Sequence, residues 1–123
     1  MARSIKRFLK KGFNFQVTGS LWIECEGERF LGPGKVELLE RIADTGSINK
    51  AAKQMGMSYK KAWGMVKILN RQTAKPFVIV QTGGEKGGGS TLTEEAWQLI
   101  KYHRLLRERF TGFLKKETNR LRT

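Results

Sequence analysis

The sequence predicts an α+β fold of one small domain, with two β-hairpins around a group of short helices and one long helix after them. Three observations predict this fold. Apolar residues alternate with polar ones between residues 13 and 25, which is the period of β-strands. Between residues 36 and 69 they recur every three or four positions, which is the period of helices. Residues 93–123 keep the helical period. With 123 residues and 39% hydrophobic content, the chain can bury a modest core.

The first predicted element is a small antiparallel sheet over residues 13–31. Its alternating apolar positions are Phe13, Phe15, Val17, Leu21, Ile23 and Cys25. Gly19-Ser20 and Gly27-Glu28 are predicted to form the turns between its strands, because glycine adopts the backbone conformations that tight turns need. We expect this sheet to have a structural role.

A first helix is predicted over residues 34–44, directly after the break at Gly32 and Pro33. Charged residues separate its apolar positions, which are Val36, Leu39, Ile42 and Ala43. Gly46 follows the last of them and is predicted to end the helix.

Two further helices are predicted, one over residues 48–55 and one from residue 59 to about residue 72, with a turn at Gly56-Met57 between them. Ser47 and Ser58 precede them as N-caps, because a serine side chain accepts a hydrogen bond from a free N–H of the first turn. The pair Ala51-Ala52 allows another helix to cross closely, since no large side chain separates the backbones. Two short helices around a glycine turn, the second rich in Lys and Arg, are typical of a helix-turn-helix.

The second of these helices is predicted to have two different faces. Its inward stripe consists of Ala62, Met65, Val66 and Leu69. The opposite face consists of Lys60, Gly64, Lys67 and Arg71. Glycine costs about 1 kcal/mol relative to alanine inside a helix, and two explanations of Gly64 remain open: close approach to a groove wall, or a tolerated substitution. Tyr59 and Trp63 lie on a flank, either within the core or, for Tyr59, in contact with a base or phosphate.

A β-hairpin is predicted directly after this helix. Residues 77–82 are rich in β-branched residues, residues 83–89 form a glycine-rich loop, and residues 90–92 form the return strand. A hairpin in this position is the wing of a winged helix-turn-helix. Lys86 in the glycine loop is predicted to lie against a DNA strand, and a loose loop tip is the alternative. A nucleotide-phosphate loop is excluded, because neither G-x-x-x-x-G-K-[ST] nor G-x-G-x-x-G occurs.

A long helix is predicted for residues 93–123. Thr93 is its N-cap, and Glu94 and Glu95 occupy the first turn, where the helix dipole favours negative charge. A seam at spacings of four and three follows, consisting of Leu99, His103, Leu106, Phe110 and Phe113. Such a seam packs on its own domain or on a second copy of the chain. Because a small domain cannot cover so long a helix, we predict a homodimer with this seam as the dimerisation surface.

The charge distribution predicts a polyanionic partner. The net charge is +13, and residues 45–84 contain seven Lys or Arg residues and no Asp or Glu. Charge of this sign attracts phosphate backbones. A generic basic protein, or one that binds anionic membranes, is a weaker hypothesis, because a high overall charge does not explain why residues 45–84 lack Asp and Glu. Residues 1–12 form a basic arm with five positive charges, either a frayed terminus or a contact to a nucleic-acid backbone.

Several other classes of protein are disfavoured. Cys25 is the only cysteine, so no disulfide framework or cysteine metal cluster is expected. The sequence starts without the apolar core of a signal peptide and has no membrane-spanning apolar run, so we expect a cytoplasmic protein with no membrane partner. The single histidine, His103, lies on the seam, and no Ser/His/Asp or Cys/His set can be assembled. We therefore do not expect an enzyme.

Residues 38–70, LLERIADTGSINKAAKQMGMSYKKAWGMVKILN, and the later TGGEKGGGSTLTEEAWQLI resemble the DNA-binding domain of the ModE-type molybdate-responsive regulators. The winged helix of these regulators is related to that of the LysR type, and the likeness spans about residues 38–106. It implies a homodimeric bacterial transcription factor whose third helix enters the major groove while the wing lies on the flanking backbone. By the same resemblance, Ser58, Tyr59, Lys60 and Lys61 would lead into the groove, with Gly64 and Lys67 further along and Lys86 at the wing.

Full-length regulators of this type add C-terminal molybdate-binding domains, whereas this chain resembles the family's short, stand-alone members. We therefore expect no cofactor, and no molybdate binding within the chain.

The sequence thus predicts a sequence-specific transcriptional regulator that binds a palindromic operator in double-stranded DNA as a homodimer. The expected parts are a basic arm (1–12), a winged helix-turn-helix domain with its leading hairpin (13–92) and a dimerisation helix (93–123). The residues predicted to bind DNA are Ser47, Lys50, Ser58, Tyr59, Lys60, Lys61, Gly64, Lys67, Arg71 and Lys86. Two alternatives remain: a weakly selective architectural DNA-binding protein, and a module that recruits an effector-sensing partner. RNA binding is a weaker hypothesis, because the strands lack an exposed aromatic platform.

Overall fold

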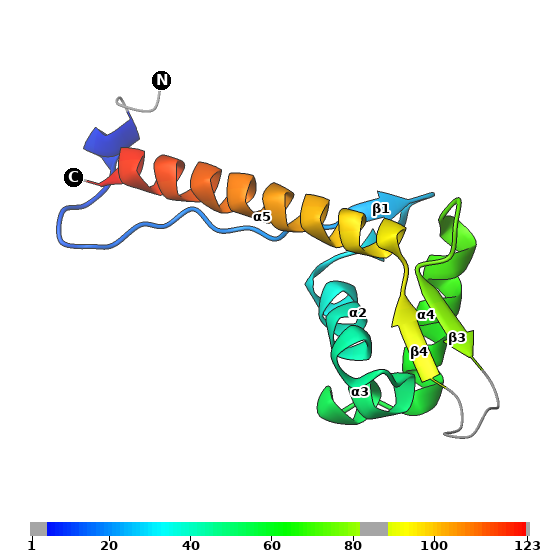
Figure 1. Cartoon of the computed structure of the whole chain (residues 1–123). Helices are drawn as coiled ribbons and strands as arrows, with labels where there is room; N and C mark the ends of the chain where they lie inside the picture. Colours follow the sequence, from blue (N-terminus) through cyan, green and yellow to red (C-terminus); the bar gives the residue numbers. More distant parts are fainter. Residues whose placement is uncertain (1–4, 82–88, 123) are drawn as a thin grey trace. The chain divides into compact units, whose positions relative to one another are not determined.

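The computed structural model of the chain describes residues 5–81 and 89–122. They belong to two compact units, which we call the HTH unit (Trp22–His103) and the terminal unit (Met1–Leu21 with Arg104–Thr123). The described residues contain helices and two antiparallel hairpins (Figure 1), so the predicted α+β class is confirmed. The long helix α5 (Glu94–Leu121) contributes residues to both units.

The HTH unit begins with a short antiparallel hairpin of β1 (Ile23–Cys25) and β2 (Glu28–Leu31). Its turn has Glu26 at φ 53° and Gly27 at φ 80°, and two successive positive φ values are what a tight two-residue hairpin turn requires. The turn predicted at Gly27-Glu28 is therefore present one residue earlier, at Glu26-Gly27, and Glu28 is the first residue of β2. Leu31 is fully buried and connects this hairpin to the core.

Lys35, in the first turn of the next helix, fixes that helix to the hairpin. Its Nζ donates a hydrogen bond to the backbone oxygen of Arg29 at 2.9 Å. Burial lowers the pKa of the Lys35 ammonium, while the negative charge of Glu28 acts in the opposite direction.

Three helices form the centre of the HTH unit: α2 (Pro33–Thr45), α3 (Ile48–Gln54) and α4 (Tyr59–Gln72). Their bounds agree with the predicted helices to within one residue. Gly46 ends α2 at φ 70°, and its N–H donates to Ile42 O at 2.7 Å. Ala51 and Ala52 are buried, which allows the close helix crossing that the sequence predicted. The core of this unit consists of Leu31, Leu38, Leu39, Ile42, Ile48, Ala51, Ala52, Ala62, Val66, Leu69, Phe77, Val78, Ala96 and Ile100.

The predicted wing is present as an antiparallel hairpin of β3 (Val78–Gln81) and β4 (Gly89–Leu92), which lies beside α4 (Figure 1). Val78 pairs with Leu92, and Gln81 pairs with Gly89. The N–H of Ser90 donates to Gly46 O at 2.9 Å, so β4 is also tied to the junction of α2 and α3. Lys86 lies outside the described residues.

The terminal unit corrects one prediction. Residues 13–18 form no strand, and they run alongside the C-terminal half of α5 (Figure 1). The N–H of Val17 donates to Oγ1 of Thr118 at 2.9 Å, so a helix side chain takes the place of a neighbouring strand. A Cβ at Gly19 would lie 3.0 Å from Phe110, so the chain passes close to α5 there. The predicted strand over residues 13–18 and the hairpin turn at Gly19-Ser20 are therefore wrong.

The described residues contain neither a membrane-spanning helix nor a metal-binding cluster of acidic, His or Cys side chains. None of their helices combines the length and apolarity needed to cross a membrane. Nor do the described His, Cys, Asp and Glu side chains form a group of three or more that could hold a metal ion.

Candidate nucleic-acid interface

Two serine caps and one glycine turn hold α3 and α4 in their arrangement. Ser47 Oγ accepts a hydrogen bond from the N–H of Lys50, and Ser58 Oγ accepts one from the N–H of Lys61, each at 3.0 Å. Gly56 supplies the turn at φ 67°, a conformation that favours glycine. Because each serine oxygen is used as an acceptor, its O–H hydrogen stays available for a phosphate oxygen.

The two faces predicted for α4 are confirmed. Ala62, Val66 and Leu69 are each 0% exposed and pack into the core, with Met65 partly buried beside them. Lys60, Lys67 and Arg71 are exposed on the other side. Because the buried face fixes the helix, the cationic face is presented to solvent in a defined orientation.

The two flanking aromatic residues have different environments. Trp63 packs against the core, whereas Tyr59 is 51% exposed at the first turn of α4. The Nζ of Lys67 lies 5.5 Å from the centroid of the Trp63 ring, a distance at which the ring attracts the ammonium. Trp63 therefore has a second effect, since it limits the directions in which Lys67 can point.

Nothing in the fold requires glycine at position 64. A Cβ at this position would meet no heavy atom within 4 Å. Internal packing therefore does not explain why α4 has its least favourable non-proline residue here. Of the two explanations of Gly64, only close approach of α4 to an external surface requires that no side chain occupy this open position.

The structure also shows two positioning contacts that the sequence did not reveal. Asn70 Oδ1 accepts hydrogen bonds from the N–H groups of Phe77 (2.8 Å) and Val78 (3.1 Å), which attaches the wing to α4. Thr93 Oγ1 donates to Pro76 O at 2.7 Å and accepts from the N–H of Ala96 at 3.3 Å. Thr93 thus caps α5, as predicted, and also anchors the start of the wing.

The predicted DNA-binding residues fall into three groups in the structure. Ser58, Tyr59, Lys60 and Lys61 lie together at the start of α4. Gly64, Lys67 and Arg71 follow on successive turns of the same helix. Ser47 and Lys50 lie at the start of α3, with Lys50 exposed.

The predicted dimerisation residues differ in how much of each is accessible. His103 is only 2% exposed within its own chain, and Leu99 packs partly against the core. Leu106 and Phe110 are half-buried, whereas Phe113 is 57% exposed. The role of these residues in a dimer stays a prediction.

These features define a class: a helix-turn-helix protein with a wing, whose second helix has a cationic outer face. Comparison with known proteins agrees with this class. Residues 34–97 match the model of the bacterial regulatory helix-turn-helix proteins of the lysR family. The chain therefore belongs to that family of bacterial regulatory helix-turn-helix proteins.

The chain is also similar to molybdenum-related proteins, which confirms the predicted resemblance to ModE-type regulators. It is 40% identical to the transcriptional regulator ModE of Haemophilus influenzae over 70% of this chain and 34% of that protein. Identity to the DNA-binding transcriptional dual regulator ModE of Escherichia coli is 37%, over 70% of this chain and 33% of that protein. Identity to the molybdenum-pterin-binding protein MopB of Rhodobacter capsulatus is 44%, over 63% and 28% respectively. The chain thus spans about a third of the length of these curated relatives.

Proposed function

We propose that the chain is a sequence-specific transcriptional regulator that acts in the cytoplasm and binds a palindromic operator as a homodimer. The observation behind this proposal is the arrangement of α4, whose buried face fixes an opposite face of exposed cations. A helix presented in this way fits the major groove, where side chains distinguish base pairs by their hydrogen-bonding groups. Lysine contacts to phosphate would supply affinity and register, and the contacts of α4 to base edges would supply the choice of site.

The dimer and the palindrome belong together in this proposal. A two-fold dimer places two copies of α4 about 34 Å apart, or a multiple of that distance, so that each meets an identical half-site. Phe113 supports the dimer, because a phenylalanine that is 57% exposed on a helix is a suitable anchor for a second copy. The other seam residues that are exposed or half-buried in the single chain would pack around Phe113.

The relatives named for molybdenum suggest a signal but do not place its receptor in this chain. We propose that the chain itself binds neither a cofactor nor molybdate, and that its response to any effector depends on another molecule. The relatives named for molybdenum match this chain over only about a third of their own length, so the property in their names need not belong to the matched part.

The test is a selection of genomic fragments by the purified protein at about 150 mM salt, close to physiological ionic strength, with and without molybdate. Recovery of one palindromic sequence supports the proposal. Recovery of fragments in proportion to their abundance rejects it in favour of a weakly selective architectural protein. A change of recovered sequence or yield with molybdate alone would show that the chain senses molybdate directly.

A further inference from the structure

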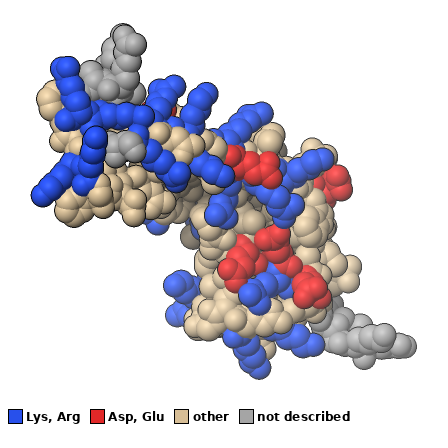
Figure 2. Space-filling view, turned by 90° about the vertical axis from the view of Figure 1, so that its left-hand side faces the viewer, with Lys and Arg blue, Asp and Glu red and all other residues tan. Residues whose placement is uncertain are grey.

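The two units of the chain differ sharply in charge balance. Among the described residues, the terminal unit has eleven Lys and Arg and only two Glu, whereas the HTH unit has eleven Lys and Arg and eight Asp and Glu. The excess positive charge is therefore concentrated in the terminal unit, which does not contain α4. Figure 2 shows Lys and Arg side chains spread widely over the upper left of the view, with few Asp or Glu side chains among them.

The cations of the terminal unit are accessible. Lys115 and Lys116 are exposed on α5, and Arg122 is exposed directly after its end. None of the three makes an ion pair with a described residue. Glu117, one of the two acids, is already paired with Arg120 at 3.1 Å. Little internal negative charge is therefore available to neutralise this surface, so it favours an external polyanion.

Polar donors accompany these cations in a groove within the terminal unit. The groove has a volume of about 430 Å³ and lies between residues 16–19 and α5. Its polar lining consists of Gln16, Thr18, Thr111, Lys115, Thr118, Asn119 and Arg122. Thr118 Oγ1 accepts from the N–H of Val17, which leaves its own O–H hydrogen for an external oxygen. Ammonium, guanidinium, hydroxyl and amide groups are the donors with which proteins contact phosphates.

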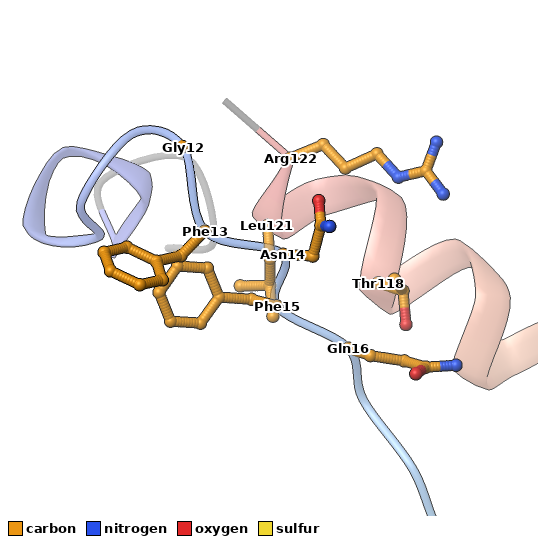
Figure 3. A pocket seen from close by; sticks show the side chains of 8 residues that line it. All are labelled: Gly12, Phe13, Asn14, Phe15, Gln16, Thr118, Leu121 and Arg122. Atoms are coloured by element: carbon orange, nitrogen blue, oxygen red, sulfur yellow. The ribbon is translucent and has the colours of Figure 1, made fainter.

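A second hollow continues this surface towards the arm. It has a volume of about 560 Å³ and shares Gln16, Thr118 and Arg122 with the first groove. Figure 3 shows Thr118 on α5 and Arg122 directly after its end, with Asn14 and Gln16 on the segment beside them. Lys10 lies 5.8 Å from the ring centroid of Phe13, so the aromatic side chain at this hollow is associated with a cation. The donors thus form a strip along the unit and not a closed pocket for a small ion.

We propose that the terminal unit is a second DNA-binding surface, which binds the phosphate backbone of double-stranded DNA without sequence preference and adds affinity to the contacts of α4. This inference rests on the proposed DNA-binding function. A membrane would instead need one continuous apolar face opposite the charges. On α5, Arg107 and Arg109 lie on roughly opposite sides of the helix, so this part of α5 does not keep its charges on one face opposite an apolar one.

The test measures the salt dependence of binding in the full chain. Lys115→Gln, Arg122→Gln and the double variant are compared with Lys101→Gln, a matched loss of one exposed charge on the part of α5 that lies in the HTH unit. The probes are the duplex recovered by genomic selection and a scrambled duplex of equal length. Each lost phosphate contact lowers the slope of log affinity against log salt by about 0.9. The double variant should therefore lose about two units of slope on both duplexes, with the preference for the selected duplex and the circular dichroism melting curve unchanged.

The outcomes separate this inference from the proposed function. If the wild type prefers the selected duplex but the double variant keeps its salt slope, the second surface is rejected and sequence-specific regulation stands. If no sequence is preferred but the slope still falls, the second surface stands and specific regulation is rejected. Loss of binding to phosphatidylglycerol vesicles in the double variant, with DNA binding unaltered, would overturn the inference in favour of a membrane surface.

Discussion

The side-chain amide of Asn70 hydrogen-bonds both backbone groups of Val78. Its Oδ1 accepts from the Val78 N–H at 3.1 Å, and its Nδ2 donates to the Val78 carbonyl at 3.0 Å. The Asn70 side chain on α4 therefore satisfies both backbone groups of the first residue of β3, as the backbone of a neighbouring strand would. The position of the wing relative to α4 depends on this contact, so Asn70 is a positioning residue for both proposed DNA contacts of the HTH unit.

Replacing Asn70 by Ala should lower the free energy of unfolding by about 2 kcal/mol, because partly buried backbone groups of Phe77 and Val78 lose their partners. Urea denaturation measures this change. Gln98→Ala is the control, since Gln98 is exposed and makes only one long hydrogen bond, at 3.4 Å to Glu94. Equal stability of both variants would show that the amide does not hold the wing. At a temperature where Asn70→Ala is still folded, its operator affinity should also fall.

Lys60→Ala and Lys67→Ala should each weaken DNA binding, because both lysines lie exposed on the outer face of α4. A lysine that contacts only phosphate will weaken all duplexes uniformly and reduce the salt slope by about one. A lysine that contacts a base edge will also reduce the discrimination between selected and scrambled duplexes, by about 1–3 kcal/mol. Fluorescence anisotropy with both duplexes distinguishes these results. Unchanged affinity for both duplexes in both variants would exclude this face of α4 from the interface.

Elements with a local signal could be predicted from the sequence. Serine at positions 47 and 58 and glycine at 46 and 56 mark helix ends through their own backbone chemistry, and the structure has caps or turns at all four positions. The division of α4 into a buried and a cationic face follows from the helical period alone. The predictions of the wing strands and of the N-cap at Thr93 also depended only on signals within a few neighbouring residues.

Features that depend on distant contacts could not be predicted. The alternation over residues 13–18 suggested a strand, but an alternating pattern does not identify a hydrogen-bond partner. Val17 bonds to Thr118, which is far away in the sequence. Asn70 gave no signal either, because asparagine is merely unfavourable inside a helix and its partners become adjacent only in the folded unit. The sequence shows each charged residue of the terminal unit, but it does not show that residues 5–21 and 104–122 come together in one unit.

Gly64→Ala should separate stability from DNA binding. An added methyl group meets no atom within 4 Å, so the gain in helix propensity should raise the free energy of unfolding by about 0.5–1 kcal/mol. If α4 approaches a groove wall at this position, the same methyl group should weaken operator binding. Thermal unfolding and anisotropy on one preparation give both values. Higher stability with unaltered binding would favour the explanation that this glycine is a tolerated substitution.

Phe113→Asp should convert the proposed dimer into a monomer. Phe113 is 57% exposed in the single chain, so the change removes an apolar side chain from the proposed interface without opening the core of its own unit. In a dimer it would also place two like charges close together across a two-fold axis, which is destabilising at short distance. Sedimentation equilibrium should show the wild type at twice the 14.0 kDa chain mass and the variant at that mass.

Thr111→Asp is the matched control, because Thr111 is exposed on the same helix and lies outside the predicted seam. His103 is unsuitable for this test, since it is 2% exposed and its replacement would change folding. A wild-type chain that sediments as a monomer at micromolar concentration would reject the dimer, whereas a Phe113→Asp chain that stays dimeric would place the interface elsewhere. A monomeric variant should also bind a single half-site about as well as the whole palindrome, because the two recognition helices would no longer be linked.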